Sequence, residues 1–373
     1  MDNVNGVPTR MHNLAAILFP GESQSGSGMF LRNTWYPCAW GKDVGRGLFQ
    51  RWICGEPVVF YRTEAGLPVA LHDRCAHRRA PLSKGQLVGD RVQCGYHGLE
   101  FDRTGRCVKI PGQDAIPENA AVRSYPVVDR WRFLWIWMGD PARADDSLIP
   151  DLHWNDHPDW VAPGDALTID ANYLLVLDNL MDLSHLTFLH GRTIGTPYVT
   201  EFPSTARTVG ERVTVTRWML DRPAPPMFQK VGGFTGNVDR WQIIDWSAPG
   251  NVVIDVGCAV AGTGAPQGDR SRGIEGRSLN LVTPMTERSS LYLWSYCRHY
   301  KQDDESVTRT IYEDVKRTFF EDKDMIEAQQ RLVDTDSRAV GTIDIRVDAG
   351  PLQVRREIER LIRRETQGAA VAA

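Results

Sequence analysis

The sequence has no long run of apolar residues. Its most apolar stretch, residues 252–262, is interrupted by Asp255 and is much shorter than the ~20 residues that a membrane-spanning helix needs. The apolar segment at residues 14–19 is too brief for a signal peptide, and Pro20 and Gly21 follow it where a cleavage site would have small side chains. We therefore expect a cytoplasmic protein without a membrane segment.

The sequence also has little imbalance of charge. Its 43 Lys and Arg residues stand against 47 Asp and Glu residues, which gives a net charge of −4, and no long segment carries charges of one sign. Proteins that bind nucleic acids or anionic membranes present concentrated basic charge, so neither is expected as a partner. The overall composition of the 373 residues indicates a globular protein of about two domains.

The sequence has few cysteines. It also lacks the motifs by which reductases and ferredoxins bind their redox cofactors. The seven cysteines are an odd number spread over a long chain, which excludes the disulfide framework of a small secreted protein. Residues 262–264 read Gly-Thr-Gly but lack the third glycine of a dinucleotide-binding loop, and no four-cysteine ferredoxin spacing occurs. A reaction that needs electrons would therefore depend on a partner protein.

The predicted elements indicate an α+β chain of two domains. Residues 1–28, which end in a Gly- and Ser-rich stretch, are expected to form a flexible arm. Residues 29–150 carry short apolar runs separated by Gly and Pro, which predict an all-β domain. Residues 151–367 combine alternating strands with helices, and residues 368–373 are expected to be a frayed tail. The helices are expected at residues 172–190, 305–333 and 353–365.

Two Cys-His pairs form the first group of candidate metal ligands. Cys75 and His77 form a C-x-H motif, and Cys94 and His97 form a C-x-x-H motif sixteen residues later. Two thiolates and two imidazoles suit either a tetrahedral zinc ion or a two-iron cluster in which His replaces Cys on one iron. Because each loop supplies one ligand of each kind, the spacing favours the cluster, with both cysteines on one iron and both histidines on the other.

This first group resembles the Rieske iron–sulfur domain. Pro81 follows the first pair, and the second pair lies in Gly-Tyr-His-Gly at residues 95–98. The resemblance implies a [2Fe–2S] cluster that carries single electrons. The other cysteines fit no ligand pattern and are interpreted as packing residues: Cys38, Cys54, Cys107, Cys258 and Cys297.

Polar residues within an otherwise apolar helix form the second group. On an ideal helix, Asp182 and His185 are about 60° apart, so their side chains can meet, whereas His185 and His190 are about 140° apart. The helix must widen or break before His190, and Gly191 permits such an ending. Two imidazoles and one carboxylate make the facial triad of mononuclear iron(II) oxygenases.

The carboxylate of this triad must come from elsewhere in the chain. We choose Asp322, in the long helix predicted near the C-terminus. Three neighbouring carboxylates remain alternatives that the sequence barely excludes: Glu321, Asp324 and Asp314.

Together the two groups resemble the catalytic α subunit of Rieske non-haem iron oxygenases, over residues 29–367. The second signature of that family, Asn-x-x-Asp-x-x-His-x-x-x-x-His, begins here at Asn179, and Asp322 fits its third ligand. The resemblance implies a helix-grip catalytic domain, an antiparallel sheet around a long helix. It also implies head-to-tail rings in which Asp182 bridges His97 of the partner subunit to His185, and an Asn179 that lies near the iron without being a firm ligand.

Within the family the sequence looks most like the vanillate and dicamba O-demethylase group, which implies a homotrimer. The implied function is oxidative O- or N-dealkylation of an aromatic compound with release of an aldehyde. The electrons would come from a flavin reductase, with or without a ferredoxin, so that NAD(P)H acts only indirectly. Asn280, in a strand before Thr283 and Pro284, favours a neutral substrate such as an anilide or aryl ether.

Other functions remain open. They are a ring-hydroxylating dioxygenase, a demethylase of an aromatic acid such as vanillate, an electron-transfer Rieske protein, and a zinc protein with a hydrolase centre. The residues expected to line the substrate pocket are Phe188, Trp218, Trp241, Trp246, Ile254, Asn280 and Trp294.

Overall fold

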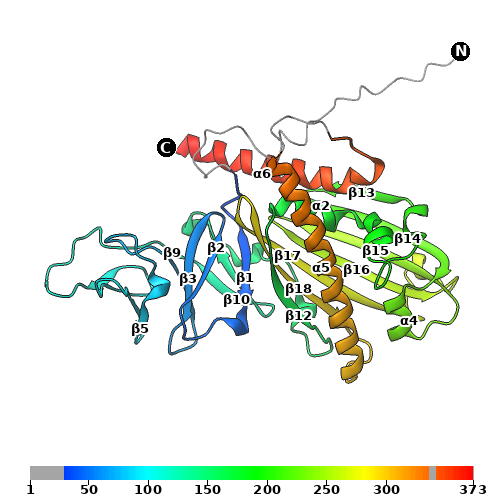
Figure 1. Cartoon of the computed structure of the whole chain (residues 1–373), viewed down its shortest axis with the longest axis horizontal. Coiled ribbons are helices and arrows are strands. Elements are labelled where there is room, and N and C mark those ends of the chain that lie inside the picture. Colours follow the sequence, from blue (N-terminus) through cyan, green and yellow to red (C-terminus); the bar gives the residue numbers. More distant parts are fainter. Residues whose placement is uncertain (1–28, 336–341, 373) are drawn as a thin grey trace, which may run out of the picture.

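The computed structural model describes residues 29–335 and 342–372 (Figure 1). The expected flexible arm, residues 1–28, lies outside the described residues. The described part consists of an all-β N-terminal unit and a C-terminal unit of one large sheet and several helices, which confirms the predicted α+β class. No helix among the described residues is both long and apolar enough to cross a membrane.

The N-terminal unit contains three small antiparallel sheets. The first is built from β1 (Trp35–Trp40), β11 (Phe133–Trp137) and β10 (Val127–Arg130). The second is built from β2 (Phe49–Ile53), β3 (Glu56–Arg62), β4 (Pro68–His72) and β9 (Ser124–Tyr125). The third is built from β5 (Gln86–Val88), β6 (Arg91–Gln93), β7 (Glu100–Phe101) and β8 (Cys107–Lys109).

The C-terminal unit is a seven-stranded antiparallel sheet with helices packed on one face (Figure 1). In spatial order its strands are β12 (Gly164–Ile169), β18 (Ser289–Arg298), β17 (Gly273–Thr286), β16 (Asn251–Val260), β15 (Asn237–Ser247), β14 (Arg212–Pro223) and β13 (Ser204–Val209). The helices are α2 (Tyr173–Met181), α3 (Leu186–Leu189), α4 (Pro226–Gly232), α5 (Glu305–Thr335) and α6 (Ala349–Ala372).

The large sheet is buried on both faces where the two units meet. Successive side chains of a strand point to opposite faces, so β17 and β18 each contribute to two cores. Leu281 and Leu293 pack with Trp135 and other tryptophans of the N-terminal unit, whereas Val282 and Trp294 pack with the helices. Backbone hydrogen bonds add to this contact: the N–H of Cys54 donates to Pro284 O at 2.8 Å, and that of Gly55 to Met285 O at 2.9 Å.

Two of the predicted helices differ from the expectation. The segment 172–190 is not one helix, because α2 ends at Met181 and Asp182 adopts an extended backbone before a 3-10 turn at Leu183–His185 and the short α3. The C-terminal helix is longer than predicted and continues to Ala372, so residues 368–372, expected to be frayed, are helical.

Candidate metal centres

The two Cys-His loops follow strands of two different sheets and have similar backbone hydrogen bonds. Cys75 lies beyond β4 and Cys94 directly after β6, and each N–H donates to a carbonyl five residues later, at 2.8 Å in both loops. Gly95 is required at the crossing of the second loop, since a Cβ atom there would lie 2.7 Å from the carbonyl oxygen of Lys84. The loops therefore hold the two thiols at fixed, adjacent positions.

The thiols are buried and the imidazoles are exposed. Cys75 and Cys94 are 3% and 2% exposed, whereas His77 and His97 lie at the surface with ring centroids 4.7 Å apart. Burial raises the pKa of Cys75 to about 11, although the N–H groups of His77 and Arg78 partly stabilise the thiolate. Metal ions supply the positive charge that holds such buried thiols as thiolates.

This geometry fits a two-iron cluster better than one zinc ion. Ligands of a tetrahedral zinc site lie within about 4 Å of one another, since Zn–S and Zn–N bonds are about 2.0–2.3 Å. Among the described residues, the group of three or more such side chains whose ligand atoms all lie within 4.8 Å of one another is a different one, described next. The spread of two buried thiols and two outer imidazoles matches the asymmetric Cys₂His₂ ligation of a Rieske cluster.

The break at Asp182 begins the short helical segment that carries the histidines of the second group. The Asp182 carboxylate accepts hydrogen bonds from the N–H and hydroxyl of Ser184, at 2.8 and 2.7 Å, and so begins the 3-10 turn that carries His185. After α3, His190 ends the helical segment, and the two imidazole centroids lie 5.2 Å apart. The sequence predicted that the helix widens or breaks between His185 and His190, whereas the structure breaks before His185.

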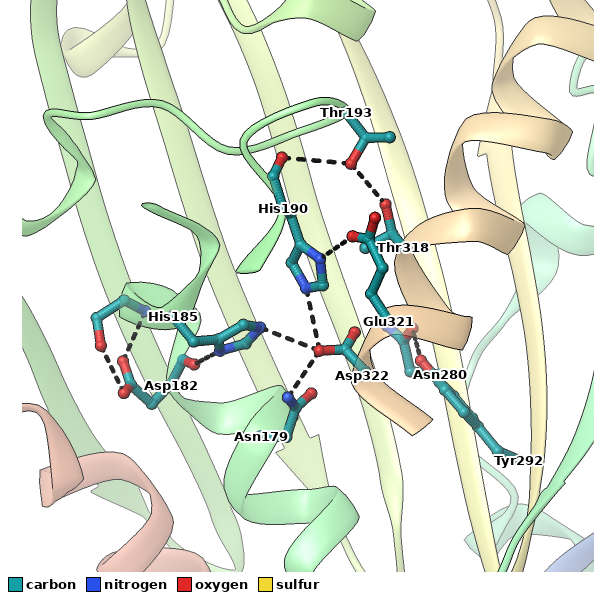
Figure 2. A network of polar contacts seen from close by, with 11 residues as sticks. Asn179, Asp182, His185, His190, Thr193, Asn280, Tyr292, Thr318, Glu321 and Asp322 are labelled. Carbon is teal, nitrogen blue, oxygen red and sulfur yellow. Dashed lines mark hydrogen bonds and ion pairs between the residues drawn. The ribbon is translucent and has the colours of Figure 1, made fainter. Parts of the chain in front are cut away.

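Asp322 on α5 completes the second group (Figure 2). Its Oδ1 atom lies 3.4 Å from Nε2 of His185 and 3.0 Å from Nε2 of His190. Asn179 donates from Nδ2 to the same oxygen at 2.9 Å. The structure thus brings four of the predicted site residues to one point, and two imidazoles with one carboxylate fit the facial triad of non-haem iron(II).

The outer nitrogen of each imidazole is held by an oxygen acceptor. Nδ1 of His185 lies 2.7 Å from the backbone oxygen of Asp182, and Nδ1 of His190 lies 2.7 Å from Oε2 of Glu321. These contacts place a proton on Nδ1, so Nε2 would be the atom that binds a metal, as is usual for histidines that bind metals. The donor set is therefore oriented for an ion.

The protonation states of Asp322 and of the two histidines depend strongly on one another. Burial by itself would raise the pKa of Asp322, but hydrogen bonds from His185 and His190 and their charges lower it to about 2. Burial would lower the pKa of His190, yet Asp322 and Glu321 raise it above its ordinary value. An ionised Asp322 beside two Nε2 atoms is the state that a divalent cation requires.

The three alternative carboxylates lie away from the ligand position. Glu321 contacts the far side of the His190 ring, Asp314 pairs with Lys230 at 3.2 Å, and Asp324 is exposed. The predicted meeting of the Asp182 and His185 side chains was wrong in detail. The backbone carbonyl of Asp182 contacts His185, whereas the Asp182 carboxylate accepts a hydrogen bond from the hydroxyl of Ser184.

The loop after His190 needs a glycine for close packing, but not the one we expected. Gly191 has open space around its Cα atom, and its backbone is not left-handed. At Gly195, by contrast, a Cβ atom would lie 2.0 Å from the carbonyl oxygen of Leu186, and its N–H donates to His190 O at 2.9 Å. Thr193 ties the same loop to α5 through Thr318, with 2.9 Å between the two hydroxyl oxygens.

A largely apolar cavity adjoins the second group and is lined by Asn179, His185, His190, Asp322 and side chains of α2, α4, α5 and the sheet. Of the seven predicted pocket residues, Ile254 is in its lining. The other six lie elsewhere: Phe188, Trp218, Trp241, Trp246, Asn280 and Trp294.

Strand alternation and local packing explain these six misses. Trp218 and Trp241 pack on each other on the opposite face of the sheet, with ring centroids 5.6 Å apart, and Phe188 is 83% exposed. Trp246 and Trp294 are packed in the core between sheet and helices. Asn280 accepts a 2.7 Å hydrogen bond from Tyr292 (Figure 2).

Sequence reasoning missed five polar residues in the cavity lining. They are Arg240 and Gln242 on β15, Ser278 on β17, Tyr296 on β18 and Thr318 on α5. The available signal was the alternation of Val238, Arg240, Gln242 and Ile244, which puts two polar side chains on the same face as two apolar ones.

Family models match both units of the chain. Residues 34–126 match the Rieske [2Fe-2S] domain, and residues 169–364 match the vanillate O-demethylase oxygenase C-terminal domain. The two matched segments contain, respectively, the Cys-His loops and the His-His-Asp group.

Individual proteins are similar over nearly their full length. The iron–sulfur subunit of a toluene-4-sulfonate monooxygenase system from Comamonas testosteroni is 42% identical, covering 92% of this chain and 100% of the relative. A vanillate O-demethylase oxygenase subunit from Pseudomonas sp. (strain HR199 / DSM 7063) is 36% identical, with 92% and 98% covered. The oxygenase component of chloroacetanilide N-alkylformylase from Rhizorhabdus wittichii is 33% identical, with 92% and 99% covered. The crystal structure of dicamba monooxygenase bound to 3,6-dichlorosalicylic acid superposes with a TM-score of 0.85 at 32% identity, with 90% and 99% covered.

Proposed function

Because this chain belongs to the Rieske non-haem iron oxygenases that include the vanillate O-demethylase oxygenase subunits, we propose that it oxidises an alkyl C–H bond of an aromatic substrate. The observation that carries the proposal is the group His185, His190 and Asp322 at the wall of a largely apolar cavity. The preferred reaction is oxidative O- or N-dealkylation. Hydroxylation of the carbon bonded to oxygen or nitrogen gives a hemiacetal or hemiaminal, which collapses and releases an aldehyde. Each hydroxylation consumes dioxygen, two electrons and two protons and also yields water.

The residues of the chain hold the two redox groups and keep water away. When bound, the cluster supplies single electrons and the mononuclear iron uses them to activate dioxygen. Cys75, Cys94, His77 and His97 would hold the cluster, and His185, His190 and Asp322 would hold the mononuclear iron. Asn179 restrains the Asp322 carboxylate through its 2.9 Å hydrogen bond. Buried Leu180, Leu183 and Leu186 line the cavity on the same side and exclude water from it.

These roles divide the chain as the sequence analysis expects. We assign residues 29–150 to the domain that carries the cluster and residues 151–367 to the catalytic domain. The assignment is supported by the positions of the ligands, since each set lies within one of these ranges.

The enzyme works as the oxygenase component of a multicomponent system and needs an external electron donor. We assign that role to a flavin reductase that oxidises NAD(P)H, acting directly or through a ferredoxin. In the single chain the candidate cluster ligands His77 and His97 are exposed, so the cluster would lie close to the surface, where a donor could reach it.

A homotrimer would solve the separation of the two centres within one chain. In Figure 1, β5 lies at the far left of the molecule, well separated from α2 and α5, which lie to the right of it near the centre. In a head-to-tail ring, the half-buried Asp182 would lie between His97 of the partner subunit and His185. A trimer would have three times the chain mass of 42.0 kDa, which light scattering measures directly.

Hydroxylation of a methyl group on the ring is the second candidate reaction. It is favoured by the 42% identity to the toluene-4-sulfonate monooxygenase subunit, which exceeds the identity to the demethylase. The two reactions differ in their products: dealkylation removes the carbon as an aldehyde, whereas methyl hydroxylation retains it as a benzylic alcohol.

The deciding experiment is product analysis with defined substrates. The chain, purified without oxygen, is combined with a surrogate ferredoxin, its reductase and NADH, and is offered an aryl methyl ether, an N-alkyl anilide and a methylarene. Aldehyde from the ether or the anilide supports dealkylation, and a benzylic alcohol alone supports the second candidate. A cis-diol would contradict both and indicate a ring dioxygenase, and sustained turnover without any partner protein would contradict the external donor.

A further inference from the structure

Arg240 is a buried cation without an anionic partner. Its side chain is on β15 and is 3% exposed. Nη2 donates to the carbonyl oxygen of Ile194 at 3.0 Å, but Nη1 has no hydrogen-bond partner among the described residues. Within the described part of the chain, no carboxylate lies within 4.0 Å of its guanidinium group. By comparison, buried Arg355 pairs with Asp178.

The titratable groups that face Arg240 supply no negative charge at neutral pH. They are Cys258, Tyr198, Tyr296 and the buried Arg217, whose charge is positive. Burial raises the pKa of Cys258 to about 12 and raises the pKa of both tyrosines above their ordinary value. Burial also lowers the pKa of Arg240, yet an arginine remains charged at pH 7. A buried, unpaired guanidinium is costly, so its retention calls for a partner that the chain does not contain.

Two further polar groups without partners lie near this cation in the cavity lining. Oε1 of Gln242 and the hydroxyl of Tyr296 are buried and form no hydrogen bond with any described residue. Gln242 follows Arg240 by two residues on β15 and so projects from the same face of the sheet. The nearby lining also includes Ser278 and the apolar Met227, Phe228 and Val256. Unsatisfied polar groups in an otherwise apolar cavity mark where a ligand presents its own polar atoms.

The neutral substrate expected from the sequence rested on Asn280 as the polar residue of the pocket. That residue is absent from the described lining of the cavity, and its side-chain oxygen already accepts the hydroxyl of Tyr292. Arg240 is instead the charged residue of the cavity lining outside the His-His-Asp group.

We propose that Arg240 selects aromatic substrates that carry an anionic head group, a sulfonate or a carboxylate, and orients their alkyl group toward His185, His190 and Asp322. The hydroxyl of Tyr296 and the amide of Gln242 add hydrogen bonds, the amide with its nitrogen turned toward the anion. Guanidinium groups bind carboxylates and sulfonate-like oxyanions through two parallel N–H donors, which fixes orientation as well as charge. This inference rests on the proposed monooxygenase function, because it names the substrate class of the same site.

Binding to isosteric charged and neutral compounds tests the proposal without turnover. The probes are 4-methoxybenzenesulfonate against 4-methoxybenzenesulfonamide, and 4-methoxybenzoate against 4-methoxybenzamide. Calorimetry on iron-loaded wild-type protein, without oxygen or reductant, should show at least one anion binding about tenfold or more tighter than its neutral partner. The stronger of the two anions identifies the head group. Equal affinity within both pairs would overturn the proposal.

Substitutions of Arg240 attribute the preference to this residue. Arg240→Gln should lose about tenfold or more in affinity for the anion and change affinity for the amide less than threefold, and Arg240→Lys should retain part of the preference. Arg207→Gln, an exposed position on β13 of the same sheet, is the matched control and should leave both affinities unchanged. If Arg240→Gln lowers the affinity for the anion and for the neutral compound of a pair equally, Arg240 does not select charged substrates.

Thermal unfolding of the ligand-free proteins separates recognition from a structural role. If Arg240 is kept for the substrate, Arg240→Met should unfold at the same or a higher temperature than wild type, because it removes an unpaired buried charge. A lower unfolding temperature for Arg240→Met would indicate that the arginine serves the fold and would count against the proposal. These binding and unfolding results do not depend on catalysis. A failed product assay with intact anion binding would refute the proposed reaction while leaving the anion site standing.

Discussion

His190 and Glu321 are joined by a 2.7 Å contact between Nδ1 of the imidazole and Oε2 of the carboxylate. An ionised carboxylate only accepts hydrogen bonds, so the nitrogen that faces Glu321 carries a proton, and Nε2, which faces Asp322, is the nitrogen that would bind the iron. The negative charge also makes the ring a stronger donor to a cation. Glu321 therefore orients His190 from the side of the ring that faces away from the metal position. The next residue in the sequence, Asp322, is itself a proposed ligand.

Replacing Glu321 should weaken iron binding at the mononuclear site. Glu321→Ala removes both the acceptor and the charge, and we expect iron affinity to fall by about 10- to 100-fold, with Glu321→Gln in between because its amide oxygen still accepts from Nδ1. Competition with an iron chelator measures the affinity. Asp324→Asn on the exposed face of α5 is the control, and an unchanged affinity in Glu321→Ala would remove Glu321 from the site.

Asp322→Ala should remove the mononuclear iron and leave the cluster in place. The wild-type protein is expected to contain about three irons and two acid-labile sulfides per chain, and this variant about two and two, with an unchanged visible spectrum. Asp324→Ala should keep three irons. If Asp324→Ala loses the iron and Asp322→Ala retains it, the assigned ligand is wrong.

Asp182→Asn should separate electron transfer from metal binding. Asn caps a helical turn as well as Asp does, and the backbone carbonyl that holds His185 is unaffected, so both metal centres should be retained. Turnover should be nearly abolished, because the proposed path from the partner subunit needs the carboxylate. The measurement is the rate at which the reduced cluster is reoxidised by dioxygen in the presence of substrate.

Ser184→Ala is the matched control for this prediction. It removes one hydroxyl that donates to Asp182 but leaves the carboxylate itself. Its reoxidation rate should stay close to that of wild type. A wild-type rate in Asp182→Asn would exclude Asp182 from the path.

The sequence could predict which candidate metal ligands lie close together where their spacing is local. Cys75 with His77 and Cys94 with His97 each lie within one short loop, and His185 with His190 lie within one helical segment. The angle between the two histidines predicted a widening or break between them, whereas the structure breaks at Asp182. The position was missed because an ideal helix treats Asp182 as one more helical residue rather than as the cap of a new turn.

The substrate cavity was poorly predicted for a physical reason. The pocket candidates were chosen for their aromatic character, without regard to the face of the strand that they occupy. Trp218 and Trp241 lie on the face of the sheet opposite the cavity. Arg240 was overlooked because charged residues are rarely buried without a partner. The register of seven strands, formed between segments distant in the sequence, determines which side chains meet the cavity.

The two glycines beside His190 give the last prediction, because they differ in the space around them. A Cβ atom at Gly195 would lie 2.0 Å from the carbonyl oxygen of Leu186, whereas none of the described atoms lies within 4 Å of one at Gly191. Gly195→Ala must shift the loop that holds His190, so we expect a loss of roughly 1–3 kcal/mol in the free energy of unfolding and weaker binding of the mononuclear iron. Gly191→Ala should change neither quantity appreciably. Urea unfolding and iron content, measured on both variants, test this difference, and a Gly195→Ala protein as stable and as rich in iron as Gly191→Ala would show that the loop can relax without moving His190.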